Sequence, residues 1–270
     1  MKLAISNIAW PSEKEERYLG LIKEWGCSGV EIAPTRIWSD PLKASLEQRR
    51  CFVDSIHKHG LEISAMQALL YGRRDLGLFR SADVETETID YLKGLCKLSA
   101  VLGAKVLVFG SPANRKRGDI PLEEAFERAA LFFSKVAPVA EKLGVCLCIE
   151  PLRPQETDFI TTAGEGLRLV ELVNNPGFGL HLDAKAVAEE GSDFVSIFKS
   201  AIYKLKHFHI NDPGLIEVNS TGLVDHISIT RALRKVGYRG YVSIEMRTLP
   251  DCDDTIKRSV QFSKKTYIDY

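Results

Sequence analysis

The feature that most constrains the fold is an alternation of short apolar runs with longer amphipathic segments along the whole 270-residue chain. Apolar runs bounded by glycine or basic residues are typical of buried parallel strands, whereas apolar residues at three- and four-residue steps are typical of helices. Eight runs fit the strand pattern: Lys2–Ser6, Gly29–Ala33, Leu61–Gln67, Lys105–Phe109, Val145–Glu150, Gly179–Asp183, Lys206–Ile210 and Tyr241–Glu245.

Helical segments lie between these runs. The stretch EEAFERAALFFSKVAPVAEKLG predicts one helix over Glu123–Gly144, with Asp119 as its N-cap before Pro121. GEGLRLVELVNN (Gly164–Asn175) and SITRALRKVGY (Ser228–Tyr238) repeat the scheme.

Eight strand–helix units in about 270 residues predict an α/β fold, a (β/α)8 TIM barrel with residues 1–270 in a single domain. A doubly wound open sheet is the alternative, but no G-x-G-x-x-G motif follows the first strand. Linkers and low-complexity segments, which would mark a domain boundary, do not occur.

The composition limits the kinds of partner that the protein is expected to bind. Lysine plus arginine and aspartate plus glutamate both total 36, so a formal net charge of zero gives no overall attraction for nucleic acid or an anionic membrane. The start MKLAISNIAW does not read as a secretion signal, and no apolar run of about 18 residues would cross a bilayer. We therefore expect a cytoplasmic protein that binds neither nucleic acid nor membrane.

The six cysteines are consistent with a cytoplasmic protein, because most of them fall inside apolar or helical patterns, where reduced thiols are common. We interpret them as reduced thiols: Cys27, Cys51, Cys96, Cys146, Cys148 and Cys252. Cys146 and Cys148 could also form a C-x-C metal pair, although no second Cys/His pair stands at zinc-site spacing.

Four residues with metal-ligand chemistry end the last four predicted strands. Glu150, Asp183, His209 and Glu245 are separated by 33, 26 and 36 residues, each about one strand–helix unit. The C-terminal strand ends of a barrel surround one mouth, so these side chains should converge there. Three carboxylates and an imidazole suit one divalent cation, Mn²⁺, Mg²⁺ or Co²⁺, and less specifically Zn²⁺. For any single residue, a helix cap, a loop position or a packed core histidine is the alternative.

These strand ends resemble the xylose-isomerase-like TIM barrel superfamily, especially its sugar phosphate isomerase/epimerase branch. That branch includes ketose 3-epimerases and inosose isomerases, with endonuclease IV as a distant relative. The resemblance is most specific in IEPLRPQETDF, GLHLDAK, HFHIND and GLVDHISITRALRKVGYRGYVSIE. It implies that the four residues bind one metal, that Glu150 and Glu245 are the acid/base pair, and that Glu156 holds substrate and tunes Glu150.

Two positions depart from the ketose 3-epimerase pattern. Ala186 stands where those enzymes carry a histidine, and PGLIEVNS lacks their substrate-gripping arginine, which puts free ketohexoses in doubt. The extra histidines of a three-metal DNA-repair site are also missing, since Gln67 stands near one of their places and Gly110 or Ser111 near another. An endonuclease IV-like function is therefore not expected.

The expected activity is a metal-dependent isomerase or epimerase in carbohydrate metabolism, acting on a sugar, sugar phosphate or cyclic polyol ketone. A glutamate would remove a proton beside a carbonyl, and a metal-stabilised enediolate would form. Return of the proton to the opposite face gives an epimer, and return to the adjacent carbon gives an isomer. A lyase or dehydratase with the same site, or a non-catalytic sugar-binding barrel, remains an alternative. The resemblance also suggests a homodimer or homotetramer.

Further residues are candidates for substrate binding. Asn7, Glu31 and Gln67 lie at the ends of the first three strands, with a loop or salt-bridge role as the alternative for Glu31. Lys185 could contact a substrate carboxylate or phosphate, or cap the following helix. Arg115 lies in the loop after the fourth strand and could bind an anionic group, although a solvated charge run is the commoner explanation.

Three other groups of residues each allow more than one interpretation. Arg73 in the loop after the third strand is a further candidate for anion binding. Trp10 could wall a sugar ring or belong to the core. His181 and His207 precede expected ligands by two residues, so they should point to the same side, deeper in the barrel.

Overall fold

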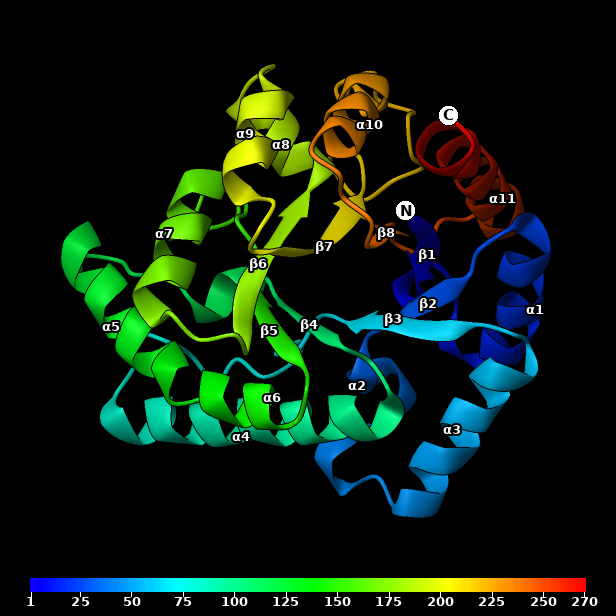
Figure 1. The fold of residues 1–270 in the computed structure, drawn as a ribbon. Helices are drawn as coiled ribbons and strands as arrows, with labels where there is room; N and C mark the ends of the chain where they lie inside the picture. Colours follow the sequence, from blue (N-terminus) through cyan, green and yellow to red (C-terminus); the bar gives the residue numbers. More distant parts are fainter.

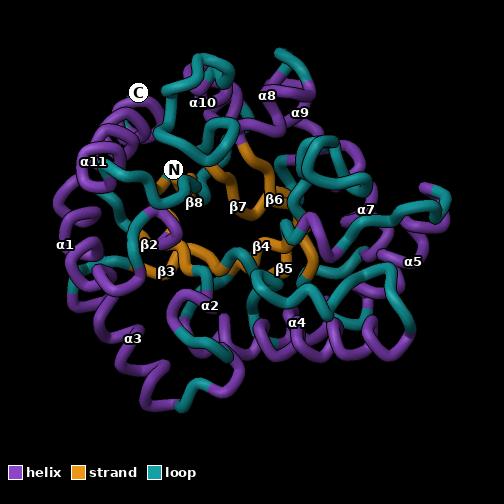
Figure 2. The backbone as a smooth tube through the Cα atoms, turned by 180° about the vertical axis from the view of Figure 1, so that it is seen from behind, coloured by secondary structure: helices purple, strands orange, loops and turns teal.

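The computed structural model describes residues 1–270 and shows eight parallel strands closed into a barrel, with β1 paired to both β2 and β8. Figures 1 and 2 show the ring of strands at the centre with helices around it. The strands are β1 Lys2–Ser6, β2 Gly29–Ile32, β3 Glu62–Met66, β4 Val106–Phe109, β5 Cys146–Ile149, β6 Phe178–Asp183, β7 Leu205–Ile210 and β8 Tyr241–Ile244. The predicted (β/α)8 barrel is confirmed.

Helices follow the strands and cover the outside of the ring. They are α1 Glu15–Trp25, α2 Pro34–Ile37, α3 Leu46–Lys58, α4 Ala82–Leu102, α5 Leu122–Ser134, α6 Ala137–Lys142, α7 Ala163–Val173, α8 Ala184–Glu190, α9 Phe194–Ala201, α10 His226–Lys235 and α11 Cys252–Ser263. None of them combines the length and the apolar character that crossing a membrane requires.

The helix predicted over Glu123–Gly144 is wrong as a single element. It divides into α5 and α6, and α6 carries Pro138 in its first turn. Proline lacks a backbone N–H and clashes with the preceding turn, so it begins a helix more readily than it continues one. The predicted N-cap, Asp119, is also wrong: the residue before α5 is Pro121, and no side chain caps this helix.

The strands separate two cores. Outward-facing side chains pack with the helices in one cluster of 68 buried residues. The interior of the barrel is lined by small side chains, among them a separate cluster of Ala65, Val106, Val108, Cys146 and Cys148. This leaves room inside the ring for larger polar groups. All six cysteines are free, and no His, Asp or Glu joins Cys146 and Cys148 in a group of potential ligands.

Candidate metal centre and acid–base site

Three carboxylates converge at the C-terminal ends of the later strands. Glu150 follows β5, Asp183 ends β6 and Glu245 follows β8, and ligand oxygens of all three lie within 4.8 Å of one another. All three residues are buried, with 6%, 0% and 9% of their surface exposed. Burying three carboxylates together is costly unless a cation or hydrogen-bond donors compensate their charge.

His209 of β7 completes the group. Its Nδ1 lies 3.4 Å from Glu245 Oε2 and 3.7 Å from Glu150 Oε1, and this buried nitrogen has no hydrogen-bond partner. An unpartnered imidazole nitrogen beside carboxylate oxygens is the donor set expected of a divalent-metal site. The donor chemistry of Glu150, Asp183, Glu245 and His209 therefore fits a divalent metal.

Glu31 fixes the orientation of His209 from the opposite wall. Its two oxygens lie 3.0 and 2.9 Å from His209 Nε2, and His207 Nε2 lies 3.4 Å from Glu31 Oε1. Burial alone would raise the pKa of Glu31, but the two imidazoles outweigh it and hold that pKa well below its usual range. Glu31 is fully buried and both its oxygens contact His209 Nε2, so its geometry is that of a group that positions a ligand.

His181 and His207 lie where the strand period predicts, inside the barrel. The His181 ring centre is 4.1 Å from that of His209, and its Nε2 is 3.5 Å from Glu150 Oε1. Burial strongly lowers the pKa of His181, and the charges of His209 and His207 act in the same direction. The two rings pack against the ligand group from within the barrel.

Asn211 is a site residue that the sequence reasoning did not single out. Its Nδ2 donates to Asp183 Oδ2 at 3.2 Å and to Glu245 Oε2 at 2.9 Å, while its Oδ1 accepts from Lys185 N at 3.0 Å. The side-chain amide of Asn211 thus bridges the carboxylates of Asp183 and Glu245. The signal was present in HFHIND, because Asn211 follows His207 and His209 at the same two-residue step.

The environments of the two predicted acid/base glutamates differ. Burial is the main effect on Glu150 and raises its pKa, with the charge of Glu245 acting in the same direction. Burial also acts to raise the pKa of Glu245, but His209, Lys185 and Asn211 together lower it to about 2. Two carboxyl groups whose pKa values move apart can divide the roles of acid and base.

Lys185 and Glu156 lie beside the carboxylates. Lys185 Nζ is 2.6 Å from Asp183 Oδ2 and 3.9 Å from Glu156 Oε1. Burial lowers the pKa of Lys185, but Asp183 and the surrounding glutamates outweigh it and raise that pKa overall. The side chain of Glu156 is about one-third exposed and accepts a hydrogen bond from Arg153 N. Glu156 was expected to act on Glu150, but its charged neighbour within 4 Å is Lys185.

Two of the other predicted substrate contacts are hydrogen-bonded to neighbouring protein groups. Asn7 is buried, accepting from Ala33 N at 2.9 Å, and Gln67 Nε2 donates to Ser6 Oγ at 2.6 Å. Trp10 is fully buried and stacks on Tyr18, so it belongs to the core.

Arg115 departs from the solvated arginine that a charge run would suggest. It is fully buried, with one hydrogen bond from Nη2 to Ile160 O at 3.3 Å, and its Nε and Nη1 have no partner. Burial lowers its pKa to about 10, against the charges of Glu150, Glu156 and Glu165. Arg115 is therefore buried within range of these carboxylate charges and does not lie on the protein surface.

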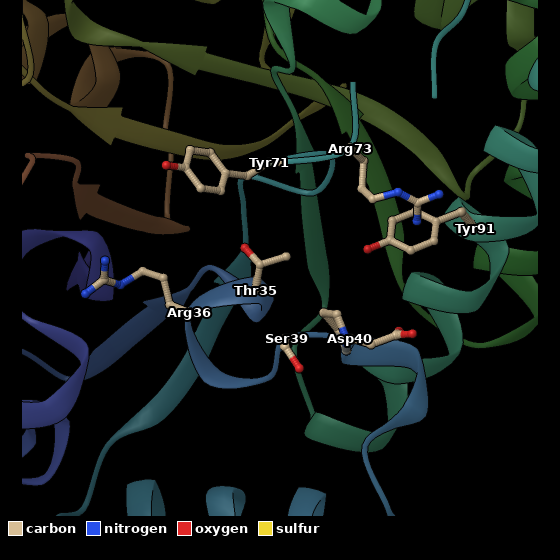
Figure 3. A pocket seen from close by; sticks show the side chains of 9 residues that line it. Thr35, Arg36, Ser39, Asp40, Tyr71, Arg73 and Tyr91 are labelled. Atoms are coloured by element: carbon tan, nitrogen blue, oxygen red, sulfur yellow. The ribbon is translucent and has the colours of Figure 1, made fainter. Parts of the chain in front are cut away.

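A separate cavity of about 500 Å³ lies between the segments after β2 and β3. None of the four candidate metal-binding residues lines this cavity. Figure 3 shows Thr35, Arg36 and Tyr71 on one side of it, with Arg73 against Tyr91 on the other. Arg73 pairs with Asp75 at 2.6 Å and with Glu87 at 3.1 Å, so its charge is already neutralised. This does not favour the anion-binding role considered for Arg73.

Comparison with known proteins places the chain in a family. A family model described as Xylose isomerase-like TIM barrel matches residues 19–266. An L-ribulose 3-epimerase from Mesorhizobium japonicum is 24% identical, over 99% of this chain and 89% of its own. A solved L-ribulose 3-epimerase has a TM-score of 0.84 at 21% identity, covering 99% and 95% of the two chains. The IOLI protein, solved with a binding zinc atom, has a TM-score of 0.75 at 23% identity, covering 100% and 97%. The chain belongs to the xylose isomerase-like TIM barrel family.

Proposed function

We propose that the protein is a divalent-metal-dependent epimerase or isomerase that moves a proton beside the carbonyl of a sugar or cyclic polyol ketone. The observation that carries this proposal is the convergence of Glu150 and Glu245 with Asp183 and His209 at one end of the barrel. Relatives named as sugar 3-epimerases support the reaction class.

Four residues would hold the metal: Glu150, Asp183, His209 and Glu245. Their oxygen-rich donor set favours Mn²⁺, Mg²⁺ or Co²⁺. Zn²⁺ stays a candidate because a structural neighbour, the IOLI protein, was solved with a zinc atom. When bound, such a cation supplies a Lewis acid that polarises the substrate carbonyl and balances negative charge on its oxygen.

The proton is handled by the two glutamates. One carboxylate removes the proton from the carbon beside the carbonyl, and the C–H electron pair forms a carbon–carbon double bond while the carbonyl oxygen takes up charge. Glu150 and Glu245 extend from β5 and β8, which are not neighbours in the ring, and the proposal requires that they face a bound sugar from opposite sides. Delivery by the second carboxyl group from the other face gives an epimer.

Surrounding residues support this pair. Asn211 and Glu31 fix Asp183, Glu245 and His209 by hydrogen bonds. Substrate contacts by Glu156, Asn7, Gln67 and Arg115 stay predictions, and the burial of Asn7 and Arg115 favours roles as supports. Cytoplasmic location and a homodimer or homotetramer also stay predictions from the sequence.

Solvent deuterium incorporation tests the proposal. Protein loaded with Mn²⁺ or Mg²⁺ is incubated in D2O with free ketoses, ketose phosphates and inososes, and the Mg²⁺ samples are read by NMR. Deuterium beside the carbonyl together with a new epimer or isomer is the expected result. Loss of water from the sugar would indicate a lyase instead. No exchange by metal-loaded protein would contradict the proposal and favour a binding role.

Glu245→Gln is the matched test of the acid/base pair. Loss of one proton-transferring group should reduce exchange roughly 10²- to 10⁴-fold. Glu24→Gln, at an exposed position of α1, is the control and should leave the rate unchanged. If Glu245→Gln still binds metal and keeps wild-type turnover, the two-carboxylate mechanism is wrong.

A further inference from the structure

Lys185 is the only buried lysine of the chain, with 5% of its side chain exposed. It is the second residue of α8, whose N-cap is Asp183. The N-terminus of a helix carries partial positive charge, so a cation there does not stabilise the helix. The position of Lys185 therefore needs another reason.

The ammonium is not required to satisfy Asp183. That carboxylate already accepts from Ala186 N at 2.6 Å and from Asn211 Nδ2 at 3.2 Å. Lys185 Nζ adds a third donor to Asp183, and its next acidic neighbour, Glu156, is 3.9 Å away, beyond hydrogen-bond distance. An ammonium has three N–H donors, so two of them have no protein acceptor.

We propose that Lys185 is a further catalytic residue, whose ammonium donates a hydrogen bond to the substrate oxygen on which negative charge develops during proton transfer. This inference rests on the proposed function and goes beyond its two glutamates and metal. Asp183 accepts one N–H of the ammonium and Glu156 lies 3.9 Å from it, so Lys185 stands among the carboxylates of the site with two N–H donors free for a substrate.

The role of Lys185 in the step is electrostatic. A glutamate removes the proton, the C–H pair becomes the carbon–carbon double bond, and the carbonyl π pair moves onto oxygen. The Lys185 N–H bond remains intact while its hydrogen bond to that oxygen strengthens. Preorganised donors of this kind contribute most where charge develops in the transition state. The proton later returns to carbon from a glutamate, and Lys185 is unchanged.

Lys185→Met tests the inference, with Lys185→Arg as the conservative variant and Lys199→Met, at an exposed position of α9, as the control. Lys185→Met should lower kcat for deuterium exchange at least roughly 100-fold with little change in KM. Lys185→Arg keeps the charge in a larger planar group and should recover part of the rate. The control should match wild type.

Metal affinity is the second readout. An ammonium on Asp183 repels a divalent cation held by the same carboxylate, so calorimetry should find that Lys185→Met binds Mn²⁺ roughly fivefold tighter. A merely structural lysine would instead lower both metal affinity and Tm when removed. That pattern, or kcat within about threefold of wild type, would overturn the inference. Absence of exchange in the wild-type protein would reject the proposed function itself and the lysine role with it.

Discussion

Glu31 on β2 and His209 on β7 face each other across the barrel, with both Glu31 oxygens about 3 Å from Nε2 of the imidazole. This contact leaves Nδ1 of His209 directed at Glu150 and Glu245. Partners that orient a metal-binding histidine typically change metal affinity 10- to 100-fold when mutated. We therefore expect Glu31→Gln to weaken Mn²⁺ binding by roughly that factor, measured by calorimetry.

The control is Glu62→Gln, which changes an exposed glutamate on β3. It should leave Mn²⁺ affinity at the wild-type value. Equal affinities for wild type and Glu31→Gln would mean that His209 does not depend on Glu31.

Gly110 is in close contact with Glu150. A methyl group at this position would lie well inside van der Waals distance of Glu150 Oε2. Gly110→Ala should therefore displace this carboxylate and reduce Mn²⁺ affinity and turnover together, roughly tenfold or more, since sites tolerate little misplacement.

A glycine elsewhere gives the control. Gly164, in the first turn of α7, has only Thr162 Oγ1 near the added carbon, at 3.9 Å, and Gly164→Ala should keep full affinity and slightly raise stability. Gly110→Ala with unchanged metal binding would show that Glu150 relocates freely.

Asp212, His226 and Tyr267 form a buried chain outside the metal centre. His226 Nε2 lies 2.8 Å from Asp212 Oδ1 and its Nδ1 lies 2.8 Å from the Tyr267 hydroxyl, while Asp212 Oδ2 accepts from Thr221 N. Asp212→Ala removes the acceptor of His226 Nε2 and of Thr221 N inside the protein, while His226 Nδ1 keeps its contact with Tyr267. We expect it to lower the free energy of unfolding by about 2–4 kcal/mol, seen in urea denaturation.

An exposed aspartate provides the comparison for this network. Asp269→Ala should change the free energy of unfolding by no more than about 0.5 kcal/mol. A similar small effect for Asp212→Ala would mean that water replaces the lost carboxylate at no cost.

Glu190 at the end of α8 makes stability depend on pH. Burial raises its pKa to about 7, and the charges of Glu165 and Asp183 add to this, against a hydrogen bond from Ala163 N. Between about pH 4.5 and 7 the folded state holds a proton on Glu190 that the unfolded state has released. The stability that Glu190 contributes is therefore fully present below about pH 4.5 and is lost as pH rises through 7.

Glu190→Gln should remove that dependence. At pH 8 the variant should be about 1 kcal/mol more stable than wild type, a value reduced because the side chain is partly exposed to solvent. The measurement is urea unfolding at pH 5 and pH 8, with Glu127→Gln, exposed on α5, as control. A difference that does not change between the two pH values would contradict the assignment.

The strand ends of the barrel were predictable because the apolar runs are short, buried on both sides and followed by ligand-type side chains. Glu150, Asp183 and Glu245 come together where the repeat placed them. The contact of Glu31 with His209 was not predictable, because it joins residues 178 positions apart and depends on how the barrel closes. Sequence showed that Arg115 lies in a basic loop, but its burial depends on packing against segments distant in the chain.

Closure of the ring through β1 and β8 has a consequence for synthesis of the protein on the ribosome. β8 is the last strand to emerge, and Glu245 follows directly after it. A nascent chain that ends before β8 has an unpaired edge on β1 and on β7, and it offers three of the four ligands. The four candidate ligands can therefore come together only after β8 and Glu245 have left the exit tunnel.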